Sequence, residues 1–419
     1  MSSPIWHPFT QHALTPDFPL IETGDGAWLT DKEGRRILDA ISSWWVITHG
    51  HRHPRIMAAI EAQAKKLDQV IFANFTHQPA EDAARGLIEI ARSSFKEGGL
   101  TRVFFSDSGS TAVEVGLKMA LGYWKASDKP RHRIMALEHA YHGDTIGAMA
   151  VGERGIFNAP YEPLLYEVTR LPFPHGDGTE TLAALEKHAP GAAALIVEPL
   201  LLGAGGMLAY APEILAAMKK ICRRHGALLI ADEVLTGFGR TGTIFACEQA
   251  GIAPDILCLA KGLTDGALPL AATLSTEAIF QAHYSPDRSR TFFHSSSFTA
   301  NPIACAAARA NLEIWKTEPV LDRIAALSQA QAQRLERFKT DSRFSDVRRI
   351  GTVAALDLKV SDPGYLSSLG PDLGRFFLEK NLLLRPLGNT IYVMPPYCVT
   401  GAELDLVYDA IGQAAEKFV

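Results

Sequence analysis

Short runs of apolar residues alternate with stretches of helical periodicity through the middle of the chain. The alternation begins at about residue 53, and most of the runs are nearly continuous, as strands buried on both faces require. The pattern therefore predicts an α/β fold with a mainly parallel sheet flanked by helices. The clearest runs are residues 102–105, 133–136, 194–197, 227–230 and 255–259.

The two ends of the chain follow other patterns. Residues 1 to about 48 are rich in Pro, Gly and aromatics, and the stretch 27–34 is typical of a hairpin, so we expect an N-terminal arm over residues 1–52. After a helix expected at 302–315, strands at 352–358 and 390–394 alternate with helical stretches. We expect a large α/β domain at 53–305 and a small α+β domain at 306–419, with the arm packing against the small domain.

Composition excludes several classes of protein. A chain of 419 residues with 47% hydrophobic content buries a large core. The net charge of -5, without a long basic run, argues against nucleic-acid and membrane-surface partners. The five cysteines form no C-x-x-C pair, and neither an apolar leader nor a membrane-spanning run is present. We therefore expect a cytoplasmic protein with reduced thiols.

Small hydroxyl residues surround a predicted helix start at residues 106–111. This segment follows a strand and precedes a helix with apolar residues at helical spacing. Free N–H groups and the helix dipole make such a terminus a candidate binding site for phosphate, with the hydroxyl groups as additional donors. Plain N-capping by the hydroxyl residues is the alternative.

Asp232 and Lys261 both come at the ends of predicted strands, where open α/β sheets place ligands. A carboxylate in that position needs a cationic partner, and a protonated pyridine nitrogen would serve. A partly desolvated lysine has a lowered pKa and attacks aldehydes more readily. The pair predicts an enzyme that holds pyridoxal 5'-phosphate (PLP) as a Schiff base on Lys261. The alternatives are a structural ion pair for Asp232 and a solvated surface position for Lys261.

Two further motifs favour other chemistry when each is taken alone. Residues 237–242 match G-x-G-x-x-G, which is typical of a dinucleotide site in an NAD-dependent oxidoreductase. The long helix that such a site requires does not follow, so we disfavour that alternative. His49, His51 and His53 alternate, but no carboxylate or cysteine set completes a metal site, and we expect none.

Large aromatic residues occur on predicted loops. Adjacent Trp44 and Trp45 would face opposite ways in a strand, so at least one should line a cavity or an interface. Tyr141 follows the run at 133–136 and has the flat ring needed to stack on a cofactor. A half-buried tyrosine with a satisfied hydroxyl is its alternative.

Taken together, these motifs resemble the class III aminotransferases of PLP fold type I. The resemblance extends over nearly the whole chain and is carried by residues 108–110, 141–143, 232–242 and 261–262. In that family the glycine motif is a tight loop beyond the aspartate strand. The resemblance implies the fold type I architecture, PLP as cofactor, and a homodimer with its active site at the subunit interface.

Within the class, the chain is most similar to the members that make 7,8-diaminononanoate in biotin synthesis. The similar segments are residues 5–10, 42–45, 297–302, 384–388 and 394–397. This resemblance implies amino-group transfer from S-adenosylmethionine to 8-amino-7-oxononanoate. Lysine as donor to the same acceptor, or a broad ω-transaminase activity, remain alternatives.

The resemblance also implies roles for individual residues. Lys261 would carry the cofactor and shuttle protons, Asp232 would face the pyridine nitrogen, and Tyr141 would stack on the ring. The phosphate would be held by Ser108, Gly109 and Ser110, together with Ser296 and Ser297 of the other subunit. The substrate-binding residues would be Phe9, Trp44, Trp45, Tyr141, Lys261, Ser295, Tyr397 and Arg385, the last receiving the carboxylate of the keto acid.

The chain departs from the family pattern at three places. Phe9 stands where many members have Tyr, and a phenyl ring stacks but cannot donate a hydrogen bond, which bears on the identity of the amino donor. Ser295 and Ser296 occupy a place where Gly-Pro is common. Asp265 replaces a frequent Gly, and the sequence assigns it no role.

Overall fold

A seven-stranded sheet forms the centre of the computed structural model, which describes residues 4–14, 18–95, 99–127 and 129–419. The strand order is β4-β12-β11-β10-β7-β5-β6. All neighbouring pairs are parallel except those that β12 makes with β11 and β4. The mainly parallel α/β sheet predicted from the sequence is thus confirmed. The strands are β4 Leu100–Ser106, β5 Ile134–Leu137, β6 Thr169–Leu171, β7 Ala194–Val197, β10 Leu228–Asp232, β11 Ile256–Leu259 and β12 Ala271–Thr276.

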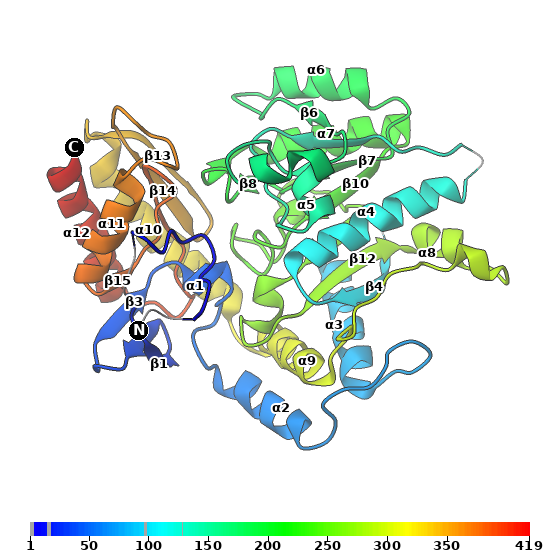
Figure 1. Ribbon diagram of the computed structural model, residues 1–419, viewed down its shortest axis with the longest axis horizontal. Coiled ribbons are helices and arrows are strands. Elements are labelled where there is room, and N and C mark those ends of the chain that lie inside the picture. Colours follow the sequence, from blue (N-terminus) through cyan, green and yellow to red (C-terminus); the bar gives the residue numbers. More distant parts are fainter. Residues whose placement is uncertain (1–3, 15–17, 96–98, 128) are drawn as a thin grey trace.

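Alternate side chains of the central strands enter two separate apolar layers, as the two-residue repeat of a strand requires. In β7, Ala194 and Ile196 belong to one layer, whereas Leu195 and Val197 belong to the other. Helix α4 Gly109–Lys125 packs on the first face and touches four strands. The opposite face is covered by helices that include α3 Gln78–Ser94 and α7 Pro212–His225, so the strands are buried on both sides (Figure 1).

The remaining helices of this region pack against the covering helices or against strands near either end of the strand order. Helix α9 packs against both α2 and α3, which joins the start of this region to its end. A short ribbon of β8 and β9 lies beyond β7. The bounds are α2 Pro54–Ala64, α5 Ile146–Val151, α6 Thr179–His188, α8 Glu277–His283, α9 Pro302–Thr317, β8 Leu201–Leu202 and β9 Leu208–Ala209.

The N-terminal strands and the C-terminal region pack together, and both chain ends lie on the same side in Figure 1. Strands β2 and β3 form the predicted hairpin, and β15 adds to β3 in parallel with Leu382 opposite Leu38. The domain boundaries at residues 52 and 305 remain predictions. The elements are β1 Ile21–Asp25, β2 Trp28–Asp31, β3 Arg36–Asp39, α1 Ser42–Trp45, α10 Val320–Lys339, β13 Phe344–Ile350, β14 Val353–Leu358, α11 Leu369–Glu379, β15 Leu382–Leu383, β16 Thr390–Val393 and α12 Gly401–Phe418.

Two general features bear on the class of protein. In the described part of the chain, no helix is long and apolar enough to cross a membrane. The five cysteines are free thiols, and Cys398 alone among them is exposed.

Candidate active site

A cavity of about 510 Å³ lies where the large sheet meets the segments contributed by both chain ends. Its floor is formed by the carboxyl ends of β10 and β11 and by the first residues of α4. Its opposite wall comes from residues near α1 and from the C-terminal region. A volume of this size suits a cofactor and a small substrate.

The N-terminus of α4 opens into this cavity through Asp107, Ser108, Gly109 and Ser110. Ser108 caps the helix, because its Oγ accepts from the N–H of Thr111 while the Thr111 hydroxyl accepts from the N–H of Ser108. The first turn holds no acidic residue, so the dipole and the unpaired N–H groups remain available to an anion. The capping alternative and the phosphate-site hypothesis are therefore compatible.

Close packing requires glycine at the start of this helix. A Cβ atom on Gly109 would lie 2.6 Å from Cγ1 of Val234, a residue that follows β10. The glycine therefore lets the helix terminus approach the end of the aspartate strand. The phosphate-binding candidate and Asp232 consequently lie in one cavity.

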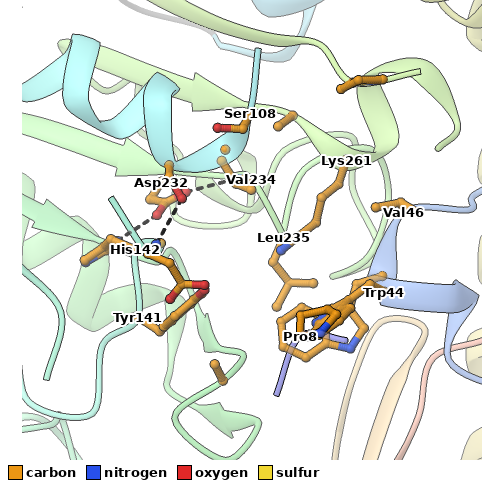
Figure 2. A pocket seen from close by; sticks show the side chains of 18 of the residues that line it. Pro8, Trp44, Val46, Ser108, Tyr141, His142, Asp232, Val234, Leu235 and Lys261 are labelled. Carbon is orange, nitrogen blue, oxygen red and sulfur yellow. Dashed lines mark hydrogen bonds and ion pairs between the residues drawn. The ribbon is translucent and has the colours of Figure 1, made fainter. Parts of the chain in front are cut away.

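Asp232 and His142 form the buried base of the cavity. Oδ2 of Asp232 lies 2.7 Å from Nδ1 of His142, and Oδ1 accepts from the N–H of Val234 at 3.1 Å. Nε2 of His142 is buried without a hydrogen-bond partner among the described residues. Figure 2 shows Asp232, His142 and Tyr141 on one side of the pocket and Lys261 with Trp44 on the other.

Lys261 emerges from the strand next to that of Asp232. Strands β10 and β11 are parallel with Asp232 opposite Cys258, so Lys261 leaves from the same sheet edge, as the sequence predicted. Its backbone has φ of +45°, at the start of a 3₁₀ turn over Lys261–Thr264. Nζ lies 4.8 Å from the ring centroid of Trp45. Burial lowers the pKa of the Lys261 amine to about 8, against the opposing influence of Asp232.

Glu198 is a buried acid of this site that the sequence analysis missed. Its carboxylate accepts from the N–H groups of Tyr141 at 2.9 Å and Gly203 at 3.0 Å. Burial, reinforced by the charge of Asp232, raises the pKa of Glu198 to about 7. The available signal was its position directly after β7, the same strand-end position that singled out Asp232 and Lys261. Burial also raises the pKa of the Tyr141 hydroxyl well above its ordinary value.

Aromatic residues and one arginine form the opposite wall. Trp44 and Trp45 both line the cavity, from a tight turn in which Ser42, Ser43 and Trp45 have positive φ. The Trp45 indole N–H donates to the hydroxyl of Tyr392 at 3.0 Å. The guanidinium of Arg385 lies 5.3 Å from the Trp44 ring centroid.

Phe9 belongs to the same wall. The carbonyl of Phe9 accepts from Nη2 of Arg385 at 3.2 Å, and its ring packs edge-on against Trp44 and Phe157. Phe157 in turn contacts Tyr365. Phe157, Tyr365 and Tyr392 all line the cavity, although the sequence analysis named none of them.

Four predicted site residues do not line the cavity of this chain. Tyr397 is buried behind it, where its hydroxyl donates to the carbonyl of Phe238 at 2.6 Å. Tyr392, on strand β16, lies at the cavity instead. The other three residues, Ser295, Ser296 and Ser297, lie on a largely exposed segment before α9.

The residues of this chain fit PLP. The helix N-terminus suits a phosphate, Asp232 suits a protonated pyridine nitrogen, and the Lys261 amine is reactive toward an aldehyde. No group of residues suited to a metal ion occurs within the described ranges.

Comparisons with known proteins agree with this geometry. The family model described as aminotransferase class-III matches residues 10–415. An adenosylmethionine-8-amino-7-oxononanoate aminotransferase of Synechococcus elongatus is 47% identical over 424 residues, which cover 99% of this chain and 98% of that protein. A protein of the same name from Geobacter sulfurreducens is 38% identical, covering 97% of this chain and 94% of its own length.

Solved structures give the same result. The crystal structure of the enzyme of that name from Methanocaldococcus jannaschii has a TM-score of 0.93 and 34% identity, covering 99% of this chain and 97% of that one. A PLP-bound amine transaminase from an uncultivated Pseudomonas species has a TM-score of 0.91 and 34% identity, covering 100% and 99%. This chain therefore belongs to the class III aminotransferase family.

Proposed function

We propose that this protein is the PLP-dependent transaminase that moves an amino group from S-adenosylmethionine to 8-amino-7-oxononanoate, which gives 7,8-diaminononanoate for biotin synthesis. The observation that carries the proposal is the placement of the Lys261 amine and the Asp232 carboxylate at one sheet edge, within a cavity that also receives the N-terminus of α4. The names of similar proteins support the choice of substrates.

Bound PLP supplies an electron sink that stabilises negative charge on the carbon bearing the amino group. Lys261 would hold the cofactor covalently through Nζ and would also accept and return the proton of that carbon. Its pKa, lowered to about 8, gives a larger neutral fraction of the amine near physiological pH than an ordinary lysine has. The Lys261 side chain enters the cavity from its floor, and Nζ lies 4.8 Å from the ring centroid of Trp45 on the opposite wall, so the amine would lie close to bound substrate.

Asp232 would hold a proton on the pyridine nitrogen. Because both oxygens of the carboxylate accept hydrogen bonds, one from His142 and one from the N–H of Val234, the side chain has a fixed orientation. The carboxylate is an acceptor, so we assign the proton of the His142 ring to Nδ1. Tyr141, whose N–H is held by Glu198, lies beside this pair and would stack on the cofactor ring.

The substrates would bind between the aromatic wall and the floor. Arg385 offers a guanidinium to the carboxylate of the keto acid, a bidentate pairing that lysine could not match. The rings of Trp44, Trp45 and Phe9 provide apolar surface for the aliphatic chain of the keto acid and a stacking face for adenine. Because Phe9 has no hydroxyl, lysine as donor remains the nearest alternative.

We further propose that two chains form a homodimer in the cytoplasm, in which Ser296 and Ser297 of each chain complete the phosphate site of the other. The side chain of Gln69 donates to the carbonyl of Ser297 at 2.6 Å, which joins two segments that carry exposed apolar residues. These residues are Ile71, Phe75, Phe293 and Phe298. An exposed apolar group of this kind is typical of a subunit interface.

Half-reaction kinetics test the donor. The purified holoenzyme is mixed with S-adenosylmethionine or with lysine, and the change in cofactor absorbance is followed by stopped flow. We expect rapid conversion with S-adenosylmethionine, and formation of 7,8-diaminononanoate after 8-amino-7-oxononanoate is added, identified by mass spectrometry. Conversion with lysine but not with S-adenosylmethionine would identify lysine as the amino donor. Conversion with neither compound would refute the proposed substrates. Light scattering with a mass of one chain would refute the dimer.

A further inference from the structure

The segment between Trp45 and His49 runs between two buried charged residues. On one side, Nη2 of Arg240 donates to the carbonyls of Ile47 at 2.7 Å and Trp45 at 3.4 Å. The Arg240 side chain is almost completely buried, with 1% of its surface exposed. The carbonyl groups of this segment therefore satisfy a buried cation.

On the other side, Asp265 binds the N–H groups of the same segment. Its Oδ1 accepts from the N–H of Thr48 at 2.5 Å, the hydroxyl of Thr48 at 2.8 Å and the N–H of His49 at 2.8 Å. Asp265 is 4% exposed and does not line the cavity. The negative charge of Asp265 and the positive charge of Arg240 partly compensate each other through the peptide groups between them.

Asp265 directly follows the 3₁₀ turn that begins with Lys261. Its three hydrogen bonds thus connect the turn carrying the reactive amine to the segment that follows Trp45. These two parts of the chain are far apart in the sequence, since Thr48 and Asp265 are separated by 217 positions. The Nζ of Lys261 and the ring of Trp45 face each other at 4.8 Å on the cavity side of this connection.

Asn311 makes a second connection between the same two parts. Its side-chain N–H groups donate to the carbonyls of Gly262 at 2.8 Å and Leu263 at 2.9 Å. Its Oδ1 lies 2.8 Å from Nε2 of His49. Since Asn311 is fully buried on α9, the turn and the segment are both anchored to one rigid helix.

We propose that Asp265 is a positioning residue that holds the Trp45–His49 segment against the Lys261 turn. It thereby keeps the substrate wall, the side of the cavity that Trp44 and Trp45 form opposite its floor, at a fixed distance from the Lys261 amine. The inference rests on the proposed function, because it needs Lys261 and Trp45 to act on one substrate. Glycine at this position would allow the same backbone conformation, with φ of +54°, but would leave the segment without its acceptor.

Two variants of Asp265 test the proposal. Asp265→Gly removes the acceptor and fits the positive φ without strain, so the backbone of the turn can keep its conformation. Asp265→Asn keeps an acceptor oxygen and loses the charge. Displacing a catalytic group by about 1 Å costs up to ~10²-fold in rate. We expect kcat/KM of Asp265→Gly to fall by about 10-fold to 10²-fold, and Asp265→Asn to recover most of the loss.

Amide hydrogen exchange provides a measurement that requires neither bound cofactor nor catalytic activity. In the apoprotein of Asp265→Gly, we expect faster exchange confined to the peptide covering residues 45–49, with β7 and β10 as protected as before. Asp31→Asn is the matched control, because Asp31 is also 4% exposed and accepts three hydrogen bonds, but in the β2–β3 hairpin away from the cavity. It should leave both readouts unchanged.

Unchanged kcat/KM and unchanged exchange in Asp265→Gly would overturn the proposal. Faster exchange throughout the large sheet would also overturn it, because Asp265 would then act only on global stability. If the wild-type enzyme fails to use the proposed substrates, the proposed function is wrong. The exchange comparison would still show whether Asp265 holds the segment.

Discussion

Nδ1 of His142 and Oδ2 of Asp232 lie 2.7 Å apart at the base of the cavity, and both side chains are buried. The two residues come from different parts of the sheet, His142 from the loop after β5 and Asp232 from the end of β10. The imidazole therefore orients the carboxylate from outside the β10 strand. This arrangement makes the orientation of the Asp232 carboxylate, which we propose faces the pyridine nitrogen, dependent on a second residue.

Loss of the His142 imidazole should leave the Asp232 carboxylate in place but less firmly oriented. In His142→Phe, one oxygen of a buried carboxylate loses its donor, which costs about 1–3 kcal/mol. We expect a lower melting temperature, weaker PLP binding and a kcat reduced by about 10-fold. His142→Asn, whose amide can donate from a similar position, should recover part of each. Equal PLP affinity in His142→Phe and wild type would contradict the orienting role.

Replacement of Lys261 should abolish turnover. Lys261→Ala removes both the covalent attachment and the proton-transferring amine, and proton transfer alone contributes about 10²-fold to 10⁴-fold. Borohydride treatment followed by peptide mapping should place the cofactor on the peptide containing Lys261 in the wild type and nowhere in the variant. A variant with normal rates would remove the basis of the assignment.

The lowered pKa of Lys261 predicts a specific pH dependence of stability. The amine has a pKa of about 8 in the folded chain against an ordinary 10.5, so between these values the unfolded chain binds more protons. The free energy of unfolding of the apoprotein should therefore contain a contribution from Lys261 that increases with pH across this window. Lys261→Met has no such group and does not bear the cost of burying a charged amine, so it should be more stable than wild type at pH 8. This difference in the free energy of unfolding should shrink as the pH rises to 10.5. Parallel urea-unfolding curves for the two proteins across the window would contradict the shift.

Arg385 should affect the keto acid more than the amino donor. Hydrogen bonds to a charged group are worth about 1.5–3 kcal/mol, so Arg385→Leu should raise KM for the keto acid by about 10-fold to 10²-fold. Steady-state kinetics with each substrate varied in turn measure the effect. Arg375→Leu is the control, because Arg375 is an exposed arginine paired with Asp372 on α11, away from the cavity. Equal effects of the two changes would refute carboxylate binding by Arg385.

A methyl group at Gly109 should collide with Val234. The expected distance of 2.6 Å between the new Cβ and Cγ1 of Val234 forces the helix terminus to move, and overpacking of this kind costs about 1–3 kcal/mol. Gly109→Ala should lower the melting temperature and weaken PLP binding. The double variant with Val234→Ala should recover stability, since it removes the colliding atom. Additive losses in the double variant would show that the collision is not the cause.

Much of the fold was predictable because buried strands carry an unambiguous signal. The runs at 194–197 and 255–259 match β7 and β11 closely. Strand β12 was missed, since its alanines, threonines and serine give it few large apolar residues. The strand-end rule placed Asp232 and Lys261 together, and the same rule, applied after β7, would have found Glu198.

The substrate wall was harder to predict because its residues meet through contacts between distant parts of the chain. Every residue of β16 is buried, so no alternation of polar and apolar residues shows that Tyr392 lies at the cavity. Tyr397 belongs to a family-like motif, yet it does not line the cavity, and its hydroxyl donates to the carbonyl of Phe238. Asp265 was left without a role because its partners, Thr48 and His49, lie more than 200 residues earlier in the chain.

The pairing of β3 with β15 determines when the substrate wall can form during synthesis. Leu38 on β3 pairs with Leu382 on β15, which is synthesised much later. The sheet beside Trp44 and Trp45 therefore stays incomplete until almost the whole chain has left the ribosome. The floor around α4, β10 and β11 needs only residues made earlier. A nascent chain should thus bring the N-terminus of α4, Asp232 and Lys261 together before the opposite wall of the cavity is complete.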